Sequence, residues 1–173
     1  MSIPIITCLL IISLTLFSPP IGADDSLTAY EVLQKYDFPV GLLPKAVTSY
    51  ELDTSTGEFT VYLNETCSFT IDGYNLKYKT KITGTISKDK ITDLKGIQVK
   101  VLFFWLNIVE VTRDGDELEF SVGIVSADFP IDNFEESPQC GCGLDCANGN
   151  GFEGEKATEF SFKRLVFSSL NQM

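Results

Sequence analysis

Residues 58–71, EFTVYLNETCSFTI, contain two short runs in which apolar and polar side chains alternate. The apolar members of the two runs are Phe59, Val61, Leu63, Cys67, Phe69 and Ile71. A period of two places successive side chains on opposite faces of a strand, so that one face is buried and the other meets water. The stretch therefore predicts two half-buried strands joined by a turn at residues 64–66.

The same period continues along the chain. Residues 72–86 predict two further strands, residues 96–112 one long or bent strand, and residues 117–125 another. Asp114-Gly115 is a hairpin signal between the last two. The unbroken apolar run VLFFWL (residues 101–106) favours a strand buried on both faces. Six or more short strands favour an antiparallel barrel or sandwich.

A single helix precedes the strands. In residues 26–38, SLTAYEVLQKYDF, Thr28 and Glu31 form a capping box, and Leu27 and Val32 hold the positions of a hydrophobic staple. The apolar residues then recur at helical spacing. Pro39 and Gly41 end this helical spacing.

The first 23 residues carry no charge, and Ile5–Phe17 is apolar over the length of a signal-peptide core. We predict a signal peptide over residues 1–23 and a mature chain that begins near Asp24. No later run is long enough to span a membrane. The predicted location is extracellular (the apoplast) or elsewhere in the secretory pathway.

The charge and the residue types exclude several functions. The net charge is −11, and no basic stripe is visible along the sequence, which argues against binding nucleic acid and anionic membrane surfaces. The chain has no histidine, so Ser-His-Asp catalysis, Cys-His catalysis and histidine-ligated zinc are unavailable. We expect no cofactor and no metal.

Four cysteines remain after the signal peptide: Cys67, Cys140, Cys142 and Cys146. An even number in an oxidising compartment is typical of disulfides; four thiolates on zinc, or a free pair, are the alternatives. Of the three connectivities, pairing Cys140 with Cys142 is least favoured, because one residue separates them. We prefer Cys67–Cys140 with Cys142–Cys146. The first bridge closes a long loop and contributes about 4 kcal/mol in the chain-entropy model. Asn64 begins the sequon NET and is a predicted glycosylation site.

Three stretches, residues 38–63, 81–106 and 134–140, are similar in order and spacing to the plant family known as domain of unknown function 538. The motifs GLLP and ITDLKGIQVK carry most of this resemblance, which extends from about Tyr30 to Cys140. It implies a plant protein with a mainly β pseudobarrel and one leading helix, and it supports the Cys67–Cys140 pairing. The family domain would occupy residues 24–140, and residues 141–173 would form a disulfide-stapled, glycine-rich loop and a tail.

The resemblance implies no agreed biochemistry. The family has been likened to lipid-binding bactericidal/permeability-increasing proteins and to esterases acting on pectin or chlorophyll, and it is linked to stress responses and trichome growth. A fold-level likeness of this kind is an analogy only.

Three function classes follow from the residues. An esterase without histidine would use carboxylates, of which Asp128 and Asp132 are the best placed. A binding module for an amphiphilic small molecule would line a pocket with apolar side chains, for which the candidates are Leu42, Leu43, Phe69, Phe103, Phe104 and Trp105. A cell-wall or protein-interaction module is the third class. We favour the non-catalytic binding module.

Overall fold

The computed structural model describes residues 27–71, 73–144 and 146, and every structural statement below concerns these residues. The predicted signal peptide (residues 1–23) and the C-terminal tail after residue 146 lie outside them. Two 3-10 turns and one α-helix accompany nine strands in the described residues. The elements, in chain order, are α2 (Ala29–Lys35), η1 (Val40–Leu42), β1 (Val47–Leu52), β2 (Glu58–Leu63), β3 (Cys67–Ile71), β4 (Tyr74–Ser87), β5 (Lys90–Val101), β6 (Phe104–Asn107), β7 (Glu110–Asp114), β8 (Glu117–Ser121), β9 (Ser126–Pro130) and η2 (Ile131–Phe134).

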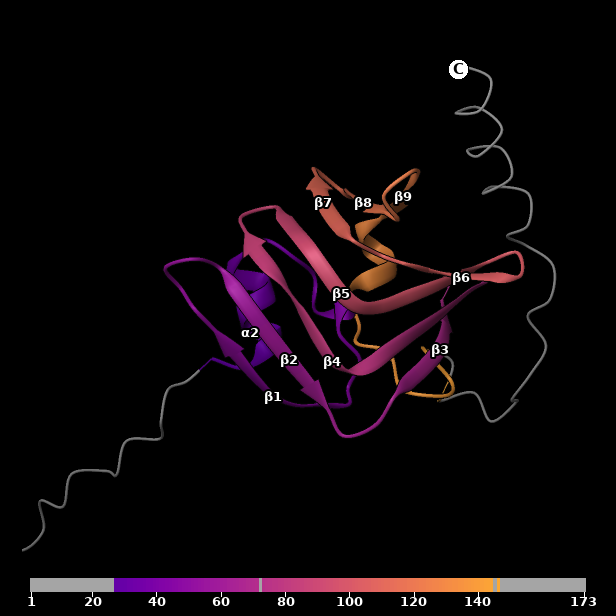
Figure 1. The fold of residues 1–173 in the computed structure, drawn as a ribbon, viewed down its shortest axis with the longest axis horizontal. Helices are drawn as coiled ribbons and strands as arrows, with labels where there is room; N and C mark the ends of the chain where they lie inside the picture. Colours follow the sequence, from indigo (N-terminus) through magenta and orange to yellow (C-terminus); the bar gives the residue numbers. More distant parts are fainter. Residues whose placement is uncertain (1–26, 72, 145, 147–173) are drawn as a thin grey trace, which may run out of the picture.

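The nine strands form one antiparallel sheet in the order β1-β2-β4-β5-β7-β8-β9 (Figure 1). Strands β4 and β5 are long enough to pair with two strands along one edge. β4 pairs with β5 along one edge and with β2 and then β3 along its other edge. β5 in turn pairs with β7 and β6 along the edge that faces away from β4. The prediction of a mainly β, antiparallel fold with one leading helix is confirmed. The sheet curls around its apolar face without closing into a barrel, since β1 and β9 end the order.

The leading helix and the first strands lie where the sequence predicts them. The Thr28 side chain accepts a hydrogen bond from the Glu31 amide, and the Glu31 carboxylate accepts one from the Thr28 amide, which completes the capping box. Strands β2 and β3 coincide with the two alternating runs, and Val61, Cys67 and Phe69 are buried.

The structure corrects the expectation for residues 96–112, which form parts of three strands. β5 ends at Val101, Leu102 and Phe103 form a two-residue turn, and β6 returns antiparallel to β5. VLFFWL is therefore a hairpin tip and not a strand buried on both faces. Turns of this length are normally marked by Gly, Asn or Asp, and none is present here. Residues 72–86 also differ from expectation, because Tyr74–Ser87 is one strand and not two.

The core lies on the concave face of the sheet, with α2, η1 and η2 covering it. Phe38, Ile82 and Leu118 are almost completely buried there. Gly41 in η1 is required by a close approach: a Cβ at this position would lie 2.3 Å from the carbonyl oxygen of Phe134. This contact packs η1 against η2 and directs the chain toward Cys140.

The cysteine-rich loop is held by two disulfides, Cys67–Cys140 and Cys142–Cys146, which is the pairing that we preferred. The Gly141 amide donates to the Ser68 carbonyl oxygen at 2.7 Å, so the loop lies along the edge of β3. An uncovered edge strand is a template for aggregation. The loop therefore protects that edge and fastens the end of the domain to β3.

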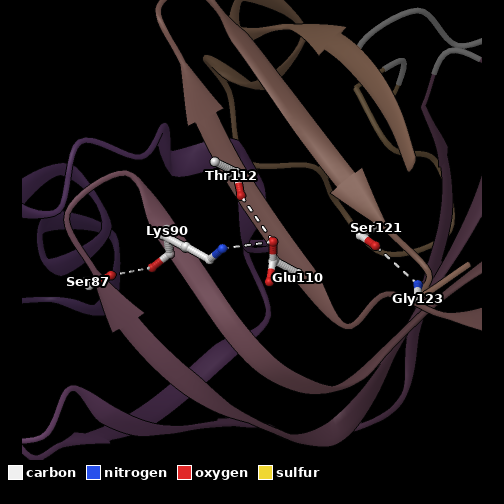
Figure 2. A network of polar contacts seen from close by, with 6 residues as sticks. All are labelled: Ser87, Lys90, Glu110, Thr112, Ser121 and Gly123. Atoms are coloured by element: carbon white, nitrogen blue, oxygen red, sulfur yellow. Dashed lines mark hydrogen bonds and ion pairs between the residues drawn. The ribbon is translucent and has the colours of Figure 1, made fainter. Parts of the chain in front are cut away.

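A small network of polar contacts strengthens the junction of β5 and β7, which pair through only two residues each (Figure 2). Lys90 Nζ lies 3.0 Å from the Glu110 carboxylate, and Ser87 donates to the Lys90 carbonyl oxygen at 3.2 Å. Both charged side chains are partly exposed, so the ion pair contributes at most about 1 kcal/mol. This network has a structural role.

Candidate functional site

The concave face of the sheet contains two adjoining apolar hollows, each of about 60 Å³. The first, called here the rim hollow, lies between β3–β5, β8–β9 and η2. Its walls are almost wholly apolar and include Leu76, Val99, Phe120, Ala127, Phe129 and Phe134. Eight of its twelve lining residues are only half-buried, among them Ile71, Val122 and Val125. The rim hollow is therefore partly open to solvent.

The second, called here the inner hollow, lies between the sheet and the segments α2 and η1. Leu42 and Leu43 line it from η1 and the residue after it, and Leu33 lines it from α2. Tyr78, Ile108 and Phe120 border both hollows. The two spaces are thus parts of one apolar interior separated by a few side chains.

Tyr78 is the polar group at the boundary between the hollows. Its ring stacks on that of Phe69 with the centroids 5.3 Å apart, and its hydroxyl donates to the Leu42 carbonyl oxygen at 3.1 Å. Burial raises the pKa of the Tyr78 phenol far above its usual range, so the side chain is neutral at physiological pH. Tyr78 consequently orients η1 against the sheet and offers no base for catalysis.

The six apolar residues predicted as ligand contacts divide into two groups. Leu42 and Leu43 line the inner hollow, and Phe69 packs behind Tyr78 in the core. The other three lie at the β5–β6 hairpin, outside both hollows, with exposed fractions of 88% for Phe103, 69% for Phe104 and 38% for Trp105. The structure does not bring these two groups together.

Several residues of the rim hollow were not singled out from the sequence. Phe120 and Phe129 alternate with acidic residues in ELEFS and SADFP, and that alternation was the signal that could have found them. Their rings meet edge to face with centroids 5.7 Å apart. We singled out the neighbouring Asp128 instead.

Those acidic neighbours point away from the hollows. Asp128 is exposed between Ala127 and Phe129, which face inward, and it lies opposite Glu119 on β8. Asp132 is exposed in η2. Across the described part of the chain, no charged side chain is buried and no group of three His, Cys, Asp or Glu residues could hold a metal ion. No helix in that part is long and apolar enough to cross a membrane.

Fold and site together define an antiparallel β protein whose apolar interior is partly open to solvent. The model of the protein family of unknown function DUF538 matches residues 29–135, and the chain belongs to that family. The chain is also 35% identical over 95 residues to "Uncharacterized protein At5g01610" of Arabidopsis thaliana. That similarity covers 54% of this chain and 55% of the relative, so the chain spans about half the length of the relative that it matches.

Proposed function

We propose that this protein is a secreted, non-catalytic binding module that takes the apolar end of an amphiphilic molecule into the rim hollow. The observation that carries the proposal is the apolar lining shared by two adjoining hollows on the concave face of an unclosed sheet. Ligand sites are typically concave and mostly apolar. The half-buried side chains of Val122 and Val125 form an entrance that can widen with little loss of core packing.

The size of the hollows narrows the class of ligand. A cavity of 150 Å³ lined by apolar side chains is known to admit benzene, and each hollow here has about 60 Å³. A slender acyl chain fits this space better than a bulky ring system. With the half-buried Phe120 moving aside, the chain would pass from the rim hollow into the inner one.

The disulfides and the exposed sequon support the proposed compartment. Disulfides persist in oxidising environments such as the extracellular space. Asn64 is exposed in the connection between β2 and β3, as a glycosylation acceptor must be. We propose that the mature protein begins near Asp24 and carries a glycan at Asn64, which intact-mass analysis of secreted protein before and after enzymatic deglycosylation would test.

Native mass spectrometry of the secreted protein tests the ligand. We expect a co-purifying fatty acid or lysolipid, and we expect added fatty acid to raise the melting temperature, as mass action requires of any ligand that binds the folded state. Ala127→Leu places extra methylene groups in the rim hollow and should abolish both effects. Leu27→Ala, which trims an exposed side chain outside both hollows, is the matched control. A folded protein that neither carries nor responds to such amphiphiles contradicts the proposal.

A further inference from the structure

The β5–β6 hairpin presents an apolar tip that projects from the end of the molecule opposite α2 (Figure 1). The tip consists of Leu102, Phe103, Phe104 and Trp105, all of them exposed large apolar side chains. Exposed apolar groups gathered in this way on a soluble protein usually mark a site of interaction. Phe104 lies on the core-facing side of its strand and is still 69% exposed, because the hairpin extends beyond the core.

Lysines lie immediately behind the tip, on the outer face of β4 and β5. Trp105 is opposite Lys100 in the β5–β6 register, and Lys77 Nζ lies 4.5 Å from the centroid of the Trp105 ring. Lys79 and Lys81 follow Lys77 at alternate positions of β4, and Lys81 Nζ lies 5.9 Å from the centroid of the Tyr62 ring. The sheet thus assembles a basic face from lysines that the sequence spreads over two segments.

Apart from Asp93 near the start of β5, no acidic residue lies on strands β4, β5 and β6. Residues 74–87 and 94–109 contain five lysines and no Asp or Glu, in a chain whose net charge is −11. The acidic remainder of the molecule is repelled by an anionic surface, whereas the hairpin end is attracted to it. The charge distribution therefore selects one orientation of approach. Clustered basic residues beside exposed aromatic ones are complementary to a lipid surface with anionic headgroups.

We propose that the β5–β6 hairpin docks this protein onto the surface of an anionic lipid bilayer, with Phe103 and Phe104 inserted among the acyl chains near the headgroups. Trp105 lies level with Lys100 in the register, and Phe103 is two residues nearer the tip, so at about 3.3 Å per residue Phe103 lies at most about 7 Å beyond Lys100. Interfacial elements bury their apolar side chains about 5–10 Å deep. When Phe103 is inserted, Lys100 and Lys77 lie at the level of the phosphates, and Trp105 takes the interfacial position that its amphipathic ring favours.

A bilayer suits this tip better than a protein partner does. A two-residue turn with apolar side chains on both faces is narrow and convex, so a fluid surface can enclose it on all sides. The backbone of the turn points to the same conclusion. Leu102 has φ of 55°, a left-handed conformation that a leucine adopts at a cost, and residues held in this way cluster at functional sites.

The experiment uses the intrinsic fluorescence of Trp105, which is the only tryptophan in the chain and lies in the proposed site. The secreted protein is titrated with vesicles of phosphatidylcholine alone, and with vesicles of phosphatidylcholine and phosphatidylserine in a two-to-one ratio. We expect a blue shift of the emission and co-sedimentation with the mixed vesicles, both weakened at high salt because salt screens the lysines. Absence of both effects in folded protein overturns the proposal.

Matched variants assign the binding to the hairpin. Phe103→Ser should weaken vesicle binding by about tenfold or more, whereas Phe103→Leu, which keeps the site apolar, should retain it. Lys100→Gln should weaken binding about fivefold, and Lys35→Gln on α2 should leave it unchanged. Equal binding by Phe103→Ser and the wild type would refute the assignment to the tip. Conversion of a dimer to a monomer by Phe103→Ser would make the tip an interface between copies and would also overturn the proposal.

Docking and ligand uptake are separable. The hairpin tip contributes none of the residues that line the hollows. Ala127→Leu should therefore lose amphiphile binding and keep vesicle binding. Phe103→Ser should keep amphiphile binding and lose vesicle binding. Loss of vesicle binding by Ala127→Leu in a folded protein would contradict the docking mode proposed here.

Discussion

Removal of the Cys67–Cys140 disulfide should be the most destabilising two-residue change in the cysteine-rich loop. The bridge joins residues 73 apart in sequence, and loop-closure entropy at that separation amounts to about 4 kcal/mol at 25 °C. Cys67 is completely buried, so replacing it by alanine adds a small packing loss. The Cys142–Cys146 bridge joins residues only 4 apart, for which the same relation gives about 2 kcal/mol.

Urea unfolding of the two double variants measures this difference. With a slope of about 2 kcal/mol/M, Cys67→Ala/Cys140→Ala should unfold at a midpoint about 2 M below the wild type. Cys142→Ala/Cys146→Ala should lower the midpoint by about half as much. If the urea midpoint of the Cys67→Ala/Cys140→Ala variant equals or exceeds that of the Cys142→Ala/Cys146→Ala variant, with unchanged slopes, the long bridge does not stabilise the fold through loop closure.

Two further predictions concern single side chains. Tyr78→Phe removes the donor to the Leu42 carbonyl oxygen and should lower the free energy of unfolding by about 1–2 kcal/mol in thermal melts, while ligand uptake is retained. Hydrogen bonds from the amide and hydroxyl of Thr28 lower the pKa of Glu31 below its ordinary value of 4.5. Because the pKa is lower in the folded state, this contribution is present above the unfolded-state pKa and is lost as the pH falls through the folded-state pKa. The stability difference between the wild type and Glu31→Gln should therefore be present at neutral pH and disappear in acid, as circular-dichroism melts across this range would show.

The sequence predicts those elements whose local signals agree with the fold. Alternation defined β2 and β3 to the residue, and Thr28 and Glu31 marked the start of the helix. The hairpin signal at Asp114-Gly115 also lies where β7 turns into β8. Each of these features depends on neighbours within a few positions, for which short-range physical chemistry is sufficient.

The candidate site was harder to predict, because its properties arise from pairing between distant segments. Lys77 and Lys100 are far apart in sequence, and only the β4–β5–β6 register brings both beside Trp105. Hence no basic stripe was visible along the chain. The hollows raise a different difficulty. The strands that carry Phe120 and Phe129 have the same composition and alternation as strands of a fully packed core. Only the three-dimensional packing leaves space between these side chains.

Leu102 is the residue at which local preference and fold disagree most clearly, and this disagreement can be tested. A two-residue hairpin turn with positive φ at its first position favours glycine, and a left-handed leucine costs about 1–2 kcal/mol. Leu102→Gly should relieve that cost, less about 0.5–1 kcal/mol for the extra freedom of glycine in the unfolded chain, and so leave the protein slightly more stable.

The same change removes an exposed apolar side chain from the hairpin tip, so vesicle binding should fall while stability rises. Phe103→Gly is the matched control, because Phe103 does not have a positive φ: it should lose both stability and vesicle binding. A stability gain for Leu102→Gly without any loss of binding would mean that the strained leucine serves no function at the tip. A stability loss would mean that the turn tolerates leucine without strain, and the backbone argument for a functional hairpin would then fail.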